Sequence, residues 1–290
     1  MDSIIKTIIY FDLFNYPLTS WELWRLSDVK KSYGDFLSSL NNFNHDRISF
    51  KHGFYYLTGR ENILVTRQIR YNVSDRKFKR AIRTTWWLSR LPWINLVGLA
   101  NQIGAHNLRA EGDIDFFIIT KPNRLWLSRL FLAGSLKLLN LRPKGSNTQD
   151  TFCLSFWVSE SQLALHDFKL NNDLYFTYWL ASLTPLFDAD NYYDHLIASN
   201  TWLNNFLPNW QTIKPNPRRS IGEPRVQPIS TWSLINKLEN LARNWQIKHL
   251  PTELKSLANL DTRVVVNTNV AKLHSEDRRV EFYKKYLNNL

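Results

Sequence analysis

One short segment constrains the fold of this chain more than any other. Residues 112–120 read Gly-Asp-Ile-Asp-Phe-Phe-Ile-Ile-Thr, a turn residue followed by an apolar run that is typical of a buried strand. Side chains two residues apart on a strand share a face, so Asp113 and Asp115 should aim at one point, about 6–7 Å apart along the backbone. They are either two solvated acids at a strand end or the ligands of a divalent cation, which would remove their mutual repulsion.

The segments around this strand extend the pattern. Residues 93–100 form a short apolar strand candidate, and residues 101–111 form a loop or short helix that leads to the Asp-x-Asp strand. A helix is expected from about residue 125 to 139, and residues 151–158 form the next strand candidate. This order predicts an α+β fold with a mixed sheet and helices packed on it.

A strand, a turn, a short helix and a strand that opens with Asp-x-Asp resemble the polymerase-β-like nucleotidyltransferase superfamily. The stretch Asp-Ile-Asp-Phe-Phe-Ile-Ile-Thr-Lys-Pro is similar to small bacterial nucleotidyltransferase-domain proteins, and the resemblance covers about residues 90–190. It implies that Asp113 and Asp115 are catalytic and bind Mg²⁺ or Mn²⁺. It also implies that the substrate is a nucleoside triphosphate.

The chain departs from the pattern of that family at two places. The Gly-Ser pair that holds the triphosphate should fall near Asn101 and Gln102, whose side chains can donate hydrogen bonds but do not allow the close backbone approach of a glycine. With the nearby but off-register Gly104, they are the candidate nucleotide-binding residues. The family also carries a third acid on a later strand. Here only Asp150 precedes that strand, either as a third metal ligand or, as we favour, as a simple strand-start residue.

The composition narrows the class of protein and its partners. The net charge of +12 favours nucleic acid, nucleotides or an anionic membrane surface as partners, although it also fits a merely soluble basic protein. The single cysteine, Cys153, excludes an internal disulfide. No signal peptide opens the chain, and no apolar run reaches the roughly 18–20 residues of a transmembrane segment, so a cytoplasmic protein is predicted.

Residues 1–58 are predicted to form a winged-helix-like module. An apolar helical stripe spans residues 3–14, Thr19 and Glu22 form a capping box, a third helix starts at Ser32, and residues 48–57 have the pattern of a hairpin. The third helix contains no Arg or Lys, which DNA binding by such a helix would need. We therefore favour a docking or scaffold role over that of a winged-helix transcription factor.

Residues 59–92 are predicted to form a basic linker helix. Apolar residues recur along one face, while the remaining surface is cationic. A docked helix with a solvated basic face is the favoured interpretation. The alternative is a ridge of cations that holds RNA, DNA or a nucleotide tail, formed by Arg76, Lys77, Lys79, Arg80 and Arg83.

The rest of the chain divides into three regions. Residues 93–210 are expected to form the nucleotidyltransferase-like domain, with aromatic-rich helices over 160–208. Residues 211–230 are a proline-rich linker, and residues 231–290 a helical C-terminal region. The first helix of that region should pack on the core or on a second subunit through Leu234, Leu238, Leu241 and Trp245. His274 and Asp277 form a polar cluster or cap the last helix.

Two functions compete on these grounds. The first is metal-dependent transfer of a nucleotidyl group from a nucleoside triphosphate to an unknown acceptor. The second is a catalytically inactive protein that binds nucleic acid or a partner through its basic surface. The missing Gly-Ser pair and the unplaced third acid favour the second, and the intact Asp-x-Asp strand favours the first, to which we lean. The sequence determines neither the acceptor nor the oligomeric state.

Overall fold

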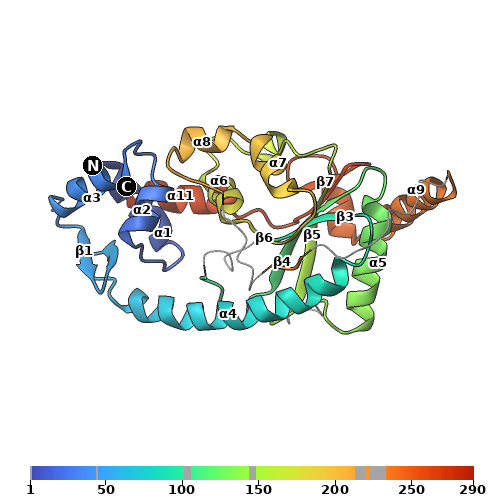
Figure 1. Cartoon of the computed structure of the whole chain (residues 1–290), viewed down its shortest axis with the longest axis horizontal. Coiled ribbons are helices and arrows are strands. Elements are labelled where there is room, and N and C mark those ends of the chain that lie inside the picture. Colours follow the sequence, from blue (N-terminus) through green and yellow to red (C-terminus); the bar gives the residue numbers. More distant parts are fainter. Residues whose placement is uncertain (1, 44, 101–105, 144–147, 213–219, 223–232) are drawn as a thin grey trace.

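A six-stranded mixed sheet organises the chain in the computed structural model, which describes residues 2–43, 45–100, 106–143, 148–212, 220–222 and 233–290 (Figure 1). Its strand order is β6-β3-β4-β5-β8-β7. The central pair, β4 and β5, is parallel, and the other neighbours are antiparallel. The strands are β3 (Ile94–Leu99), β4 (Ile114–Thr120), β5 (Phe152–Ser159), β6 (Thr184–Asp188), β7 (Val264–Val266) and β8 (Val270–Leu273). The predicted α+β class with a mixed sheet is confirmed.

Helices cover both faces of this sheet. One face carries α4 (Asn62–Leu88), α5 (Leu125–Leu138) and α9 (Ser233–Lys248), and the other carries α6 (Leu174–Ser182), α7 (Tyr192–Ala198) and α8 (Trp202–Phe206). The apolar run of β4 serves both sides, because Phe116 packs in the first core and Phe117 in the second. A strand buried on both faces reads as continuous hydrophobic sequence, which is the pattern seen in residues 116–119.

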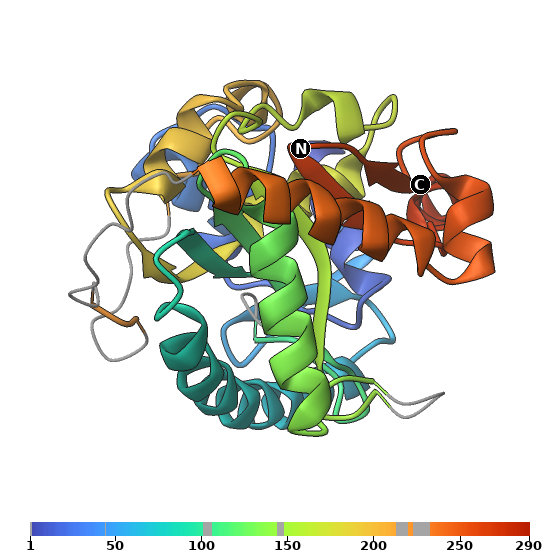
Figure 2. The ribbon, with the colours of Figure 1, turned by 90° about the vertical axis from the view of Figure 1, so that its right-hand side faces the viewer.

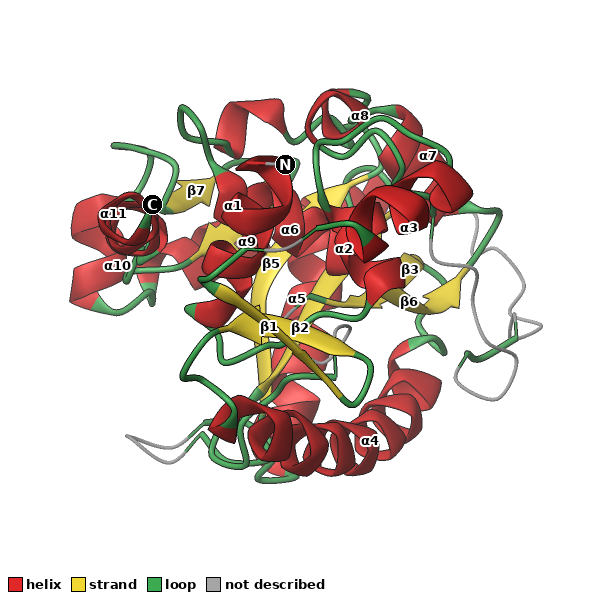
Figure 3. Ribbon diagram, turned by 90° about the vertical axis from the view of Figure 1, so that its left-hand side faces the viewer, coloured by secondary structure: helices red, strands yellow, loops and turns green. Residues whose placement is uncertain are grey.

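The N-terminal module, residues 2–58, has a hydrophobic core of its own. The Thr19–Glu22 capping box forms as predicted, with Thr19 N donating to Glu22 Oε2 over 2.9 Å. Figure 3 shows the hairpin of the module in front of the sheet. The elements of the module are α1 (Asp2–Asp12), α2 (Ser20–Leu26), α3 (Tyr33–Asn41), β1 (Ile48–Lys51) and β2 (Phe54–Leu57).

Two helices join the module to the sheet. The long helix α4 runs from the hairpin to the sheet along one side of the molecule (Figure 1). On the other side, α11 (Arg279–Asn289) brings the end of the chain back to the module, where Tyr286 enters the module core. The guanidinium of Arg47 donates to the Leu290 carbonyl over 3.0 Å. The module and the sheet therefore enclose a space between these two helices.

The sheet is wider than the sequence predicted. Residues 160–208 were expected to be helical, but β6 lies among them at one edge of the sheet. The predicted helical region 231–290 contains α10 (Thr252–Leu257) and α11, but it also supplies β7 and β8 at the other edge. These strands have three to five residues each, too few for a clear period-2 pattern, and they form because a neighbouring strand offers hydrogen bonds.

The helix α9 faces the opposite way from the prediction. Leu238, Leu241 and Trp245 are exposed, so packing of this stripe on the core is wrong. Glu239 and Gln246 are buried instead. The carboxylate of Glu239 accepts the first backbone N–H groups of α5, from Trp126 at 2.8 Å and Leu127 at 2.9 Å, where the helix dipole favours negative charge.

Two further expectations concern the linker and the membrane. Residues 213–219 and 223–230, most of the predicted proline-rich linker, lie outside the described residues. Among the described residues, no helix combines the length and the apolar character needed to cross a membrane.

Candidate metal centre and its cleft

The parallel pairing of β4 and β5 builds a cluster of possible metal ligands at the start of both strands. Asp115 lies opposite Cys153 in the strand register. One oxygen from Asp113, one from Asp115 and the sulfur of Cys153 all lie within 4.8 Å of one another. The three side chains are half-buried. The two carboxylates therefore meet at one point, as the spacing along the strand predicted.

The environment of the cluster disfavours negative charge. Burial raises the pKa of Asp113, and the positive charges of Lys77 and Arg142 only partly oppose this effect. A cation bound between the carboxylates would stabilise their ionised forms.

The third predicted metal ligand lies elsewhere. Asp150 takes a left-handed conformation with φ 58°, and its carboxylate accepts two hydrogen bonds from Arg76 at 2.8 and 3.2 Å. Lys77 Nζ lies 3.4 Å from the same carboxylate. Asp150 is thus held by α4 and lies outside the cluster, which favours the strand-start residue over the third metal ligand, in agreement with the interpretation favoured from the sequence. The residue that completes the cluster is Cys153.

The donor set fits a hard divalent ion. Burial raises the pKa of the Cys153 thiol, and the charge of Asp115 raises it further. A thiol is also a soft ligand, which suits Mg²⁺ and Mn²⁺ less well than the carboxylate oxygens do. Asp113 and Asp115 then remain as two oxygen donors. Mg²⁺ and Mn²⁺ prefer oxygen, and Mg²⁺ is commonly held by one or two carboxylates with substrate phosphates and water in the other positions.

One residue of the predicted basic surface is buried. Lys77 is 0% exposed, because its stem packs inside the molecule and its Nζ is held by backbone carbonyls. It donates to the Ala110 carbonyl over 2.8 Å and to the Gly112 carbonyl. Lys77 therefore fixes the turn that presents Asp113, and its place on a cationic surface is a wrong prediction.

The rest of the predicted basic ridge is exposed. Arg76 pairs with Asp150, and Lys79 pairs with Asp75 at 3.0 Å, which neutralises part of the ridge. This pairing weakens the ridge as a site for nucleic acid. The exposed ridge residues are Arg76, Lys79, Arg80 and Arg83.

A cleft of about 810 Å³ opens beside Asp115. Its walls come from the N-terminal module, α4, the sheet and α11. It is lined by six cationic side chains and four acidic ones. The cations are Arg70, Arg109, Lys272, Arg278, Arg279 and Lys285. Three of the cations are paired within the chain, Arg278 and Lys285 with Glu281 and Arg279 with Asp173 and Asp277. The predicted nucleotide-binding residues Asn101, Gln102 and Gly104 lie outside the described residues.

The sequence indicated His274 and Asp277 near the end of β8, but sequence reasoning missed Ser155 and Lys272, which line the cleft beside them. Ser155 Oγ and His274 Nε2 lie 2.8 Å apart, and burial lowers the pKa of His274 to about 3, so this imidazole is neutral. Burial also lowers the pKa of Lys272, to about 8. Lys272 and His274 are two residues apart, and this spacing on a strand was the available signal. Asp277 accepts the backbone N–H of Arg279 at 3.0 Å, but it lies one residue before the N-cap, Arg278, which has no side-chain cap hydrogen bond.

Aromatic rings form another part of the cleft wall. Tyr175 and Phe282 stack with ring centroids 5.5 Å apart, and Phe14 lies 5.0 Å from Phe282. All three line the cleft. Ring faces of this kind can stack with a nucleobase.

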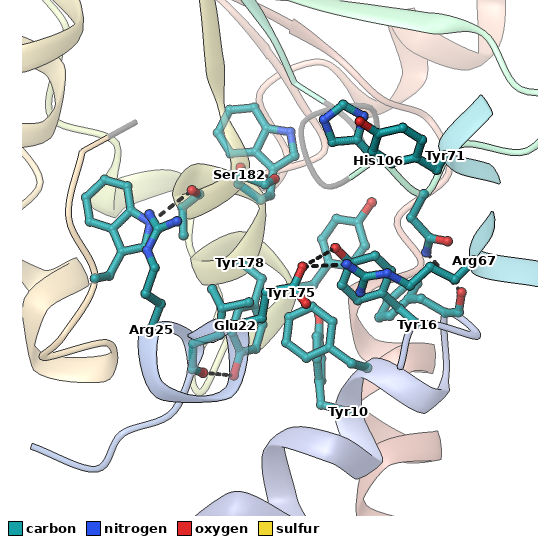
Figure 4. A pocket seen from close by; sticks show the side chains of 17 residues that line it. Tyr10, Tyr16, Glu22, Arg25, Arg67, Tyr71, His106, Tyr175, Tyr178 and Ser182 are labelled. Atoms are coloured by element: carbon teal, nitrogen blue, oxygen red, sulfur yellow. Dashed lines mark hydrogen bonds and ion pairs between the residues drawn. The ribbon is translucent and has the colours of Figure 1, made fainter. Parts of the chain in front are cut away.

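A second, smaller pocket of about 240 Å³ lies between the N-terminal module and α6 (Figure 4). It is lined mainly by aromatic rings, and it shares Phe14, Tyr175 and Trp179 with the cleft. Its charged pair is internally satisfied, since Glu22 accepts from Arg67 at 2.8 Å and from the Tyr16 hydroxyl at 2.7 Å (Figure 4). The arrangement is that of a packed junction, so we place the chemistry in the larger cleft.

Comparisons of the chain with protein-family models, with curated proteins and with solved structures found no match.

Proposed function

We propose that this chain is a nucleotidyltransferase-like protein that transfers a nucleotidyl group from a nucleoside triphosphate to an acceptor. The observation that carries the proposal is the convergence of Asp113 and Asp115 at the wall of a cleft that also holds cationic side chains, among them Arg70, Arg109 and Lys272. In this proposal the sheet is a nucleotidyltransferase-like sheet, and the three helices and hairpin at the N-terminus are a winged-helix-like module.

Each part of the cleft has a role in this proposal. Asp113 and Asp115 would hold Mg²⁺ or Mn²⁺, which supplies positive charge to the phosphates of the substrate. Lys77 keeps the preceding turn in place through the carbonyls of Ala110 and Gly112. The cations of the cleft neutralise the remaining phosphate charge, and an acceptor hydroxyl attacks the α-phosphorus in line and displaces pyrophosphate.

A specific observation favours the second candidate, a catalytically inactive nucleotide- or partner-binding protein. The strand beside Asp115 offers the thiol of Cys153, and Asp150 is held by Arg76 and Lys77. The cluster thus has two carboxylates, whereas the resembled family uses three. Such a site would bind a metal-nucleotide complex more weakly and could lack turnover.

Calorimetric titration of the four nucleoside triphosphates with Mg²⁺ or Mn²⁺ tests the proposal. We expect metal-dependent binding that is lost in the Asp113→Asn/Asp115→Asn double variant. The control variant Asp167→Asn removes an acidic side chain that is 66% exposed and should bind as the native protein does.

The outcomes separate the candidates. Metal-dependent binding followed by pyrophosphate release with an RNA or small-molecule hydroxyl supports the enzyme. Binding that never yields pyrophosphate supports the inactive binding protein. A folded native protein that binds no triphosphate contradicts the nucleotidyltransferase and leaves the protein that binds nucleic acid or a partner through its basic surface.

A further inference from the structure

Large hydrophobic side chains are exposed at one end of the molecule. This end is formed by α5, α9 and the last turns of α4, and it lies opposite the N-terminal module (Figures 1 and 2). The exposed fraction is 85% for Leu138, 69% for Trp87 and 63% for Leu241. We call this end the α5–α9 face and define it by the exposed residues Trp86, Trp87, Phe131, Leu138, Leu139, Leu238, Leu241 and Trp245.

The exposure on α9 follows from how the helix is fixed. Its polar residues Glu239 and Gln246 point inward, where Glu239 binds the start of α5 and Gln246 Nε2 donates to the Trp126 carbonyl over 2.7 Å. The apolar stripe of α9 is thereby turned to the outside. The inward side of α9 also packs Ala242 and the partly buried Ile235 and Ile247 on the core. The helix is therefore apolar on two sides, and its outer stripe is available to a partner.

Positive charge surrounds these hydrophobic side chains. Residues 76–93 and 121–143 contain no Asp or Glu, and the one acid of α9, Glu239, is buried. The guanidinium of Arg90 lies 3.9 Å from the ring centroid of Trp86. Exposed cations lie on these helices and on the segment just after α4. They include Arg83, Arg90, Lys137, Lys237 and Lys248.

The charge pattern selects among the partners that could cover this face. In a symmetric dimer the face would meet a copy of itself and bring cations against cations. A nucleic acid would satisfy the cations but not Leu138, Leu139, Leu238 or Leu241. An anionic lipid bilayer satisfies both features, because tryptophan and leucine enter the interfacial region while Lys and Arg meet the lipid headgroups.

We propose that the α5–α9 face docks this protein on a bilayer that contains anionic phospholipid. None of the described residues that line the cleft belongs to the α5–α9 face, and the N-terminal module, which supplies Leu13 and Phe14 to the cleft, lies at the opposite end of the molecule (Figure 1). This inference does not depend on the proposed function.

Vesicle flotation tests the docking. The probes are phosphatidylcholine vesicles with and without phosphatidylglycerol, and the protein is the full chain. We expect binding only to the vesicles with phosphatidylglycerol, weakened by added salt, and about tenfold weaker binding for Leu241→Ser/Trp245→Ser. The matched control Phe50→Ser/Val65→Ser removes two hydrophobic side chains, each 61% exposed, from the N-terminal module and the start of α4 and should bind normally.

Circular dichroism establishes that both double variants are folded, and sedimentation of the native protein measures self-association. Three results would overturn the proposal. They are equal binding to both vesicle types, undiminished binding by Leu241→Ser/Trp245→Ser, or a dimer that this variant dissolves in the absence of lipid. A protein partner that blocks the face without any lipid binding would also overturn it.

Discussion

Two groups of carboxylates near the same cleft have opposite electrostatic environments. Asp173 and Asp277 are both bonded to Arg279, at 2.8 and 2.5 Å. For Asp277, the hydrogen bonds and charge of Arg279 outweigh the effect of burial and lower the pKa. For Asp113, burial dominates and raises the pKa.

The difference separates a structural role from a ligand-binding role. The carboxylates around Arg279 are neutralised by the chain itself and tie α11 to the segment before α6. Asp113 and Asp115 instead gather near a neutral thiol, at a place where an added cation would favour their charge. The first group should therefore control stability, and the second should control the binding of metal and nucleotide.

The largest change in stability should come from substitution of Arg279, which holds the first group of carboxylates. Its guanidinium also donates to the Phe168 carbonyl at 2.8 Å and to Thr262 Oγ1 at 2.7 Å, in a pair with Asp173 that is nearly fully buried. Arg279→Met leaves buried Asp173 without this cation and should lower the free energy of unfolding by about 3–5 kcal/mol. Urea denaturation followed by circular dichroism measures the change.

The neighbouring Arg278 supplies the control. Its side chain is 57% exposed and pairs with Glu281 on the surface. Arg278→Ala should cost less than about 1 kcal/mol. Equal losses for the two variants would show that Arg279 does not hold the structure together.

An intermediate effect is expected at Cys153. Cys153→Asp adds a third carboxylate to the cluster and should tighten Mn²⁺ binding about tenfold, which corresponds to about 1.4 kcal/mol. Cys153→Ser keeps the size of the side chain without the charge and should leave the affinity nearly unchanged. Calorimetry with Mn²⁺ alone compares the two, and equal affinities would place the metal away from Cys153.

The smallest effect, with opposite signs in the two groups, should appear in the pH dependence of stability. The pKa of Asp113 is higher in the folded protein than in the unfolded chain. Its contribution to the free energy of unfolding is therefore fully present below the pKa of the unfolded chain, and it is lost as the pH rises through the pKa of the folded protein. Asp113→Asn should therefore be more stable than the native protein at neutral pH, and the difference should shrink at acidic pH.

Asp277 should behave in the reverse manner. The pKa of Asp277 is lower in the folded protein than in the unfolded chain. Its contribution to the free energy of unfolding is therefore present above the pKa of the unfolded chain, and it is lost as the pH falls through the pKa of the folded protein. Asp277→Asn should be less stable than the native protein at neutral pH, with a smaller difference in acid. The melting temperatures of both variants and of the native protein are measured from about pH 3 to about pH 8, a range that includes the usual pKa of a carboxyl group. If both substitutions changed the melting temperature at neutral pH in the same direction, the two groups of carboxylates would not differ in the way described.

Local sequence was enough to predict the elements that depend on local interactions. The apolar run of β4 and the Thr19–Glu22 capping box involve neighbours in the chain, and both form as expected. The shared face of residues two apart on a strand brought Asp113 and Asp115 together. The short strands β6 and β8 could not be predicted in the same way, because β3 and β5, with which they pair, are distant in the sequence, and β7 joins the sheet only through β8.

An α+β chain with two acids at the start of a buried strand follows from the residues alone. The groups around these acids follow from the folding of distant segments onto one another. The tertiary structure placed Cys153 in the cluster, held Asp150 on α4, buried Lys77 under the turn before Asp113, and brought Lys272 and Arg279 to the cleft. The physical reason is that burial and ion pairing depend on contacts between distant segments, whereas strand spacing and capping are set by neighbouring residues.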